Sequence, residues 1–106
     1  MMIIYEVTTD VQPDHIEAYE RYMRERHIPD VMATGCFVSA TLTHSIPGRY
    51  RVAYLARNMD VLDEYLGAHS EQFRDDFAAE LGSNVRVSRE VWAEMHRWTA
   101  GGDASP

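Results

Sequence analysis

The order of segments with strand-like and helix-like patterns constrains the fold of this chain more than any other feature of its sequence. Polar and apolar side chains alternate through residues 2–8 and 50–57, which predicts a strand in each. Residues 36–44 and 85–93 also have the apolar and β-branched content of strands. Apolar residues recur at helical spacing from Ile16 towards His27, and again from Leu62 to Leu81. The predicted order is therefore strand, helix, strand, strand, helix, strand.

A proline and an asparagine indicate where the two helical segments begin or end. Pro29 disfavours helical geometry in the residue before it, so the first helix is expected to end near His27. A short turn over residues 30–34 would follow. Asn58 can cap the second helical segment, which residues 67–70 interrupt.

This order is the split β-α-β-β-α-β pattern of the ferredoxin-like fold, an α+β fold with two helices on one face of an antiparallel sheet. The chain has 106 residues, the length of one domain. We expect one domain over residues 1–98 and a flexible tail over residues 99–106. The second face of the sheet would be bare, and a second copy in a two-fold homodimer is the simplest cover for it. An apolar run near the end of the last strand could add interface: Val91, Trp92, Met95, Trp98.

The charge balance excludes several classes of partner. The chain has 17 acidic against 10 basic residues and a net charge of −7. Affinity for nucleic acid or anionic membrane comes mainly from cationic side chains, so neither partner is expected. No segment approaches the roughly 20 apolar residues of a membrane span, and the start of the chain lacks the basic region of a signal peptide. We therefore expect a cytoplasmic protein.

Two gaps in the composition exclude chemistry. The chain has no lysine, so no Schiff base can form with a carbonyl substrate or with pyridoxal phosphate. Cys36 is the single cysteine, which excludes an intrachain disulfide and a cysteine-rich zinc site. Its place before an apolar strand favours a small buried residue over a nucleophile.

The segment over residues 27–37, His-Ile-Pro-Asp-Val-Met-Ala-Thr-Gly-Cys-Phe, is the most distinctive in the chain. It resembles the signature of a family of small, uncharacterised bacterial proteins in the dimeric α+β barrel superfamily. The resemblance spans residues 1–95 and includes the strand with Tyr54 and the last strand with Arg89. The family has no established activity, so the resemblance implies the fold and the dimer rather than a reaction.

His27 with Pro29, and Gly35 with Phe37, also resemble a feature of antibiotic-biosynthesis monooxygenases, lactone isomerases and polyketide cyclases. Many of these relatives need no cofactor. The resemblance implies a site in a cavity between the helices and the sheet of each protomer.

His27 and Arg89 are the candidates for chemistry at that cavity. A histidine at the end of the first helix could act as a general acid or base near neutral pH, or it could simply bond the free carbonyls of the helix end. Arg89 interrupts the apolar series of the last strand, which places a guanidinium on an apolar face. Its partner could be an anionic ligand or an acid of the fold, such as Glu6.

Tyrosine, threonine and histidine side chains supply the remaining candidates. Tyr54 could orient or protonate an oxyanion, and Tyr5, Thr34 and His69 are candidates for substrate binding. Packing in the core is the alternative for both tyrosines, and a solvated loop is the alternative for His69. His27 and His69 could meet in space, but no local spacing predicts a metal site, so no metal or cofactor is expected.

Two hypotheses for the function follow. The first is a cofactor-independent enzyme, of isomerase, cyclase or monooxygenase type, acting on a small carbonyl-bearing or aromatic metabolite. His27, Tyr54 and Arg89 would be its catalytic residues. The second is a non-catalytic module that binds a small molecule or acts through its dimer.

Overall fold

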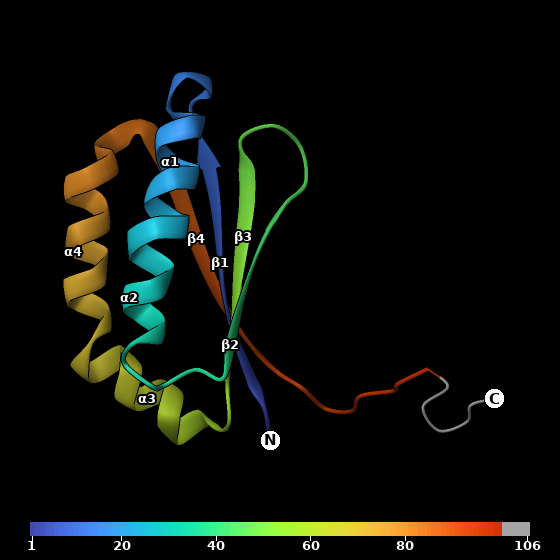
Figure 1. Ribbon diagram of the computed structural model, residues 1–106. Helices are drawn as coiled ribbons and strands as arrows, with labels where there is room; N and C mark the ends of the chain where they lie inside the picture. The colour runs from blue at the N-terminus through green and yellow to red at the C-terminus, as the bar shows by residue number, and fades with distance from the viewer. Residues whose placement is uncertain (101–106) are drawn as a thin grey trace.

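The sheet has four antiparallel strands, and the helices cover one of its faces (Figure 1). The computed structural model describes residues 1–100. The strands are β1 (Ile3–Val11), β2 (Ser39–His44), β3 (Arg49–Ala56) and β4 (Val85–Ala93), in the spatial order β2-β3-β1-β4. This confirms the predicted α+β, ferredoxin-like arrangement. Most of the predicted tail, residues 101–106, lies outside the described residues, so the domain limits stay a prediction.

The register of the central strands decides which side chains face the helices. On β1 the residues Ile3, Tyr5, Thr9 and Val11 are buried, because they alternate onto the side that the helices cover. Val7, on the same side, pairs with Arg89 of β4. Arg89 therefore starts from the helix-covered face, as the apolar series of the last strand predicts.

The first helical segment is longer than predicted. It runs through η1 (Pro13–His15), α1 (Ile16–Tyr22), η2 (Met23–His27) and α2 (Ile28–Met32). The expected end near His27, with a turn over residues 30–34, was wrong. In η2 the chain makes a π-helical turn, and the Ile28 amide donates to the Met23 carbonyl, five residues back. A wider turn before Pro29 lets the helix continue, because a proline ring clashes with a carbonyl four residues back in a regular α-helix.

The segment before β2 differs from the prediction. β2 begins at Ser39 rather than at residue 36, since both Cys36 and Phe37 are buried and the alternation of a strand is lost there. The ring of Phe37 packs 4.8 Å from that of Tyr65 and 5.0 Å from that of Tyr54, measured between centroids. Burial of these apolar side chains therefore places the segment against the end of the core, and the segment does not extend the edge strand of the sheet.

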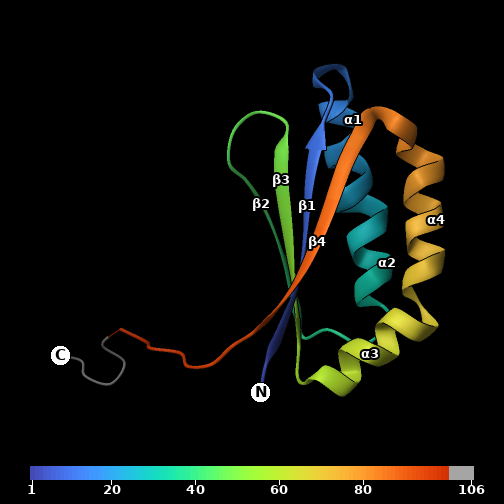
Figure 2. The same ribbon diagram turned by 180° about the vertical axis from the view of Figure 1, so that it is seen from behind.

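The second helical segment forms two helices, α3 (Met59–Ala68) and α4 (Ser70–Leu81). The Asn58 side chain accepts a hydrogen bond from the Val61 amide at 2.9 Å, as predicted for a cap. His69 separates the helices. Figure 2 shows α4 beside the first helical segment, while α3 lies across one end of the sheet. None of the helices described over residues 1–100 is long and apolar enough to cross a membrane.

The layer between sheet and helices is rich in tyrosine. The hydrophobic core includes all six tyrosines of the chain together with aliphatic residues: Tyr5, Tyr19, Tyr22, Tyr50, Tyr54, Tyr65. Each tyrosine buries a large apolar ring and brings a polar hydroxyl into the layer. Aromatic and polar groups therefore lie together in the wall of a cavity in this layer.

Candidate functional site

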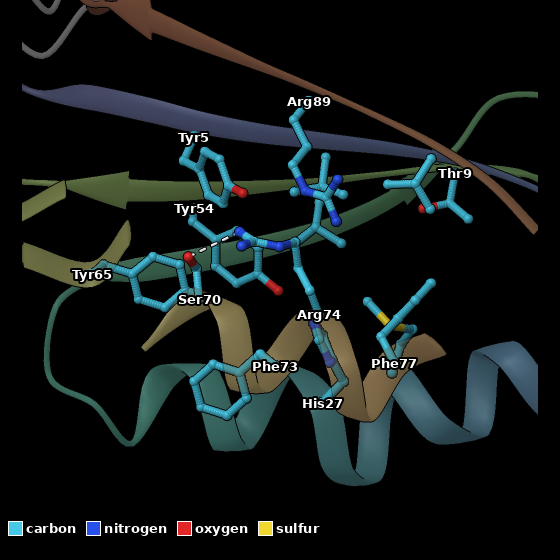
Figure 3. A pocket seen from close by; sticks show the side chains of 14 residues that line it. Tyr5, Thr9, His27, Tyr54, Tyr65, Ser70, Phe73, Arg74, Phe77 and Arg89 are labelled. Atoms are coloured by element: carbon cyan, nitrogen blue, oxygen red, sulfur yellow. Dashed lines mark hydrogen bonds between the residues drawn. The ribbon is translucent and has the colours of Figure 1, made fainter. Parts of the chain in front are cut away.

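The cavity lies between the helix-facing side of the sheet and the helices η2 and α4 (Figure 3). Its volume of about 40 Å³ is room for a few water molecules. The wall combines aromatic and aliphatic residues with a few polar ones: Tyr5, Val7, Thr9, Met23, His27, Val52, Tyr54, Tyr65, Ser70, Phe73, Arg74, Phe77, Val87, Arg89. Four of the six residues predicted from the sequence as site candidates are among them.

His27 reaches the cavity from the π-helical turn η2. Its ring packs against Phe73 and Phe77 of α4, with centroid distances of 6.2 and 5.5 Å. The pKa of His27 is lowered to about 4, chiefly by burial; the charges of Asp30 and Asp76 oppose the shift and that of Arg89 contributes to it. The imidazole is therefore neutral at pH 7, the form that can accept a proton.

Tyr54 supplies a hydroxyl without a hydrogen-bond partner among residues 1–100. The residue is 2% exposed, so water on the protein surface does not reach it. Burial raises the pKa of Tyr54 far above its ordinary value, so the phenol keeps its proton. Tyr5 lies beside it across β1 and β3, with 6.2 Å between the ring centroids. The arrangement offers an unused donor to any ligand oxygen in the cavity.

Two arginines lie at the cavity, one from the sheet and one from the helices (Figure 3). Arg89 is exposed rather than enclosed, because β4 is an edge strand. Arg74 comes from α4, and its Nη1 donates to the hydroxyl of Ser70 at 3.0 Å. Within residues 1–100 neither guanidinium forms an ion pair, so the predicted partner among the acids of the fold, Glu6, is not used by Arg89. Glu6 pairs with Arg51 instead.

Thr34 and His69 lie outside the wall of this cavity. Thr34 donates to the Val31 carbonyl at 2.7 Å and accepts from the Cys36 amide at 3.2 Å, so it ends the helix α2. His69 lies between α3 and α4, near Cys36 and Glu64. The ligand atoms of these three residues lie within 4.8 Å of one another. Tetrahedral zinc holds its ligand atoms closer, about 3.3–3.8 Å apart given its bond lengths, so this group would have to contract to hold a metal.

Sequence analysis missed several polar and aromatic residues of the wall, Arg74 above all. One signal was available, because residues 70, 73, 74 and 77 share one helical face by their i, i+3, i+4 and i+7 spacing. The two phenylalanines in that set predict the buried face of α4. A serine and an arginine on the same face were the sign that it meets a polar site.

Comparisons with known proteins place the chain among small α+β proteins. Residues 2–95 match a sequence family described as a domain of unknown function (DUF4286). No curated protein matches the chain.

Solved structures resemble it over almost its whole length. Rv0793 from Mycobacterium tuberculosis is 21% identical, with a TM-score of 0.68 over 93% of this chain and 100% of the other. A candidate antibiotic biosynthesis monooxygenase from Caulobacter crescentus is 23% identical, with a TM-score of 0.71 over 90% of this chain and 91% of the other. The cofactor-independent oxygenase SnoaB from Streptomyces nogalater is 14% identical, with a TM-score of 0.68 over 91% of this chain and 95% of the other. At these identities the likeness shows a shared fold.

Proposed function

The chain belongs to the DUF4286 family, and we propose that it is an enzyme acting on a small carbonyl-bearing or aromatic metabolite held in the cavity between helices and sheet. One observation carries the proposal. A neutral histidine and an unpartnered tyrosine hydroxyl line the same partly enclosed, largely aromatic cavity, next to a guanidinium. The names of two structural neighbours describe oxygenases, which adds support for an enzyme with this fold.

The proposed first step is a proton transfer. His27 accepts a proton from a carbon next to the ligand's carbonyl group, or from a phenolic oxygen. When the C–H bond breaks, its electron pair forms a C=C bond and the π pair of the carbonyl moves onto the oxygen, so the ligand becomes an enolate. Tyr54 donates a hydrogen bond to that oxygen and Arg89 stabilises the new charge. Isomerisation, cyclisation and oxygenation can all start from such an anion, and these side chains stabilise it without a cofactor.

A charged ligand also adjusts the base. In the free protein, burial and Arg89 hold the pKa of His27 low. Negative charge developing beside Arg89 would offset the effect of that cation and raise the pKa of His27 towards neutral. The histidine would then become a stronger proton acceptor when the reaction needs one.

Turnover by variants tests the proposal. Small aromatic acids, phenols, lactones and quinones are first screened for compounds that raise the melting temperature of the protein. Each selected compound is incubated with the protein, recovered, and compared by mass spectrometry with the compound before incubation. We expect the wild type to convert at least one compound into a product, and His27→Gln to do so at a rate lower by 100-fold or more. Full activity of a folded His27→Gln protein would remove the proposed base.

A non-catalytic ligand-binding module is the second candidate, because the same hydroxyl and guanidinium groups can hold a ligand without reacting with it. The two functions differ in one result. A binding module returns every bound compound unchanged, whereas the proposed enzyme does not.

We also propose that the chain is a homodimer, paired through the face of the sheet that the helices leave open. Ile4, Leu55 and Trp92 lie side by side on that face by the strand register. Trp92 is 48% exposed, and Met95 and Trp98 beyond β4 are 89% and 82% exposed, so this end has apolar surface to bury. A cytoplasmic location and the lack of nucleic-acid or membrane partners stay predictions.

A further inference from the structure

We propose that the natural ligand of the cavity is a small aromatic acid, and that Arg74 and Arg89 together bind its carboxylate at the mouth. The inference deepens the proposed function and rests on the same cavity. Both guanidinium groups extend towards the space beside Tyr54, one from α4 and one from β4 (Figure 3). Two cations that converge from different elements repel each other unless an anion lies between them.

The acidic composition makes these unused cations informative. The chain has 17 acidic residues and 10 arginines. Six arginines form ion pairs with carboxylates of the chain: Arg21, Arg24, Arg26, Arg49, Arg51, Arg97. Two of the other four, Arg74 and Arg89, line one cavity. Despite the surplus of carboxylates, none within residues 1–100 pairs with either, which leaves both available to an anion from outside.

The Ser70 hydroxyl orients one of the two groups. It accepts a hydrogen bond from Arg74 Nη1 at 3.0 Å and donates its own proton to the Leu66 carbonyl at 2.8 Å. Ser70 is 2% exposed. This buried contact holds the guanidinium of an otherwise exposed side chain at the cavity, with further N–H groups left for a ligand. Guanidinium groups bind carboxylates with paired, coplanar hydrogen bonds, which favours a carboxylate as the anion.

The interior of the cavity indicates the rest of the ligand. Rings of Tyr5, Tyr65, Phe73 and Phe77 form much of the wall, and flat apolar groups pack well against such rings. At the inner end, the Tyr54 hydroxyl is buried and has no hydrogen-bond partner among residues 1–100. A ligand with a carboxylate at one end, an aromatic body and a carbonyl or hydroxyl oxygen at the other would satisfy all three features. The free volume of about 40 Å³ is smaller than the roughly 150 Å³ of a cavity that holds benzene, so the proposal requires the exposed side chains at the mouth to move outward when a single ring enters, and it excludes a polycyclic ligand.

Calorimetric titration with charged and neutral probes tests the proposal. Benzoate and benzamide have nearly the same shape, and the isomers of hydroxybenzoate add a second oxygen. We expect the wild type to bind benzoate or a hydroxybenzoate at least tenfold more tightly than benzamide, with an affinity that falls as salt rises. Arg74→Gln and Arg89→Gln should each lose about tenfold for the acids and leave the affinity for benzamide unchanged. Benzamide binding as tightly as the acids would overturn the proposal.

Arg86→Gln is the matched control, because Arg86 lies on β4 like Arg89 but does not line the cavity. A loss with Arg86→Gln equal to that with Arg89→Gln would show a general effect of charge and overturn the assignment. Phosphate serves as a further probe. Inorganic phosphate that binds more tightly than benzoate would show an oxyanion site without the aromatic part.

Failure of this inference and failure of the proposed enzyme give different results. If the acids bind through both arginines but come back unchanged, and no other compound is altered, the ligand class stands and catalysis falls. If a neutral carbonyl compound is turned over by the wild type, and benzoate binds Arg74→Gln as tightly as it binds the wild type, the enzyme stands and the carboxylate site falls.

Discussion

At the scale of single residues, two tyrosine hydroxyls in the core lack a hydrogen-bond partner within residues 1–100, those of Tyr19 and Tyr54. A buried polar group without a partner costs about 1–3 kcal/mol. Such a cost persists in a fold when the group serves something other than stability. Of the two, Tyr54 lines the cavity and Tyr19 does not. A comparison of the two positions therefore distinguishes an effect on stability from an effect on the ligand.

Replacing each hydroxyl tests that separation. We expect Tyr54→Phe to raise the free energy of unfolding by about 1 kcal/mol, because the change removes an unsatisfied group from the core. The same variant should weaken binding or turnover of the ligand. Tyr19→Phe should leave the ligand unaffected and raise stability less, because the Thr9 side chain lies beside the Tyr19 hydroxyl and lowers its pKa against the effect of burial. Urea unfolding and ligand titration measure both effects, and a destabilised Tyr54→Phe protein would mean that the hydroxyl has a partner after all.

Protonation of His27 should make the protein acid-sensitive. Burial lowers the pKa of His27 to about 4 in the folded chain, against an ordinary value of 6.5. The unfolded chain then binds the proton more tightly, so stability is full above pH 6.5 and falls as the pH drops towards 4. The loss should be on the order of 3 kcal/mol once both states are protonated. Urea unfolding between pH 7 and 4 measures this loss. The free energy of unfolding should depend less steeply on pH in His27→Gln than in the wild type. An equal slope in the variant would assign the acid sensitivity to other groups.

The sequence predicted part of the candidate site, and the reason lies in the periods of strands and helices. Tyr5, Tyr54 and Arg89 were placed on one face by the two-residue period of strands, and all three line the cavity. Arg74 was missed because the side chains of a helix point in all directions around its axis. An arginine next to an apolar stripe on a helix is more often exposed to solvent than part of a site. Thr34 was proposed from its segment alone, and it caps a helix instead. The roles of all these residues remain predictions.

At the scale of elements, the connection between β2 and β3 depends on one glycine. Gly48 has a φ of +87°, and a Cβ there would lie 2.9 Å from the Val11 carbonyl oxygen. That carbonyl belongs to the residue whose amide donates to Gly48 at 2.8 Å, so the hairpin end is tied to β1. The backbone cannot shift without breaking this contact.

Alanine substitutions at two glycines should therefore have opposite effects. Gly48→Ala should lower the free energy of unfolding by about 1–3 kcal/mol, through strain at positive φ and the clash with Val11. Gly67→Ala lies within α3, where an added Cβ meets nothing within 4 Å. It should raise the free energy of unfolding by about 0.5–1 kcal/mol through helix propensity. Thermal unfolding of the two variants provides the comparison, and a Gly48→Ala protein as stable as the wild type would show that the turn can rearrange.

The order of the elements was predictable, while their junctions were not. Strands alternate and helices repeat their apolar residues because one face of each element is buried. The sequence of each element therefore indicates its type. Pro29 is the instructive exception. Local preference correctly identified a disturbance of the helix, but the π-helical turn over residues 23–27 absorbed it, and packing of Val31 in the core stabilises the continued helix. The tertiary contacts that stabilise such a turn cannot be predicted from the local sequence pattern.

At the scale of the whole molecule, the proposed dimer predicts the mass in solution. Sedimentation should give twice the 12.2 kDa of the chain. Trp92→Glu should shift the protein towards the monomer, because it places a charge among Ile4 and Leu55 on the open face of the sheet. Ile46→Glu is the control, since Ile46 is also exposed, at 57%, but lies in the β2–β3 turn at the other end of the molecule (Figure 1). A wild-type protein that sediments as a monomer would contradict the proposal.

The positions of the two tryptophans decide what intrinsic fluorescence can report. Trp92 and Trp98 are 48% and 82% exposed, whereas the core is lined by tyrosines. Indole emission shifts with the polarity around the ring, so unfolding of the core should change the emission maximum little. Burial of either indole by a second chain should shift it to shorter wavelength. Tryptophan emission is therefore a natural optical gauge of self-association in this protein, and a poor one of its melting.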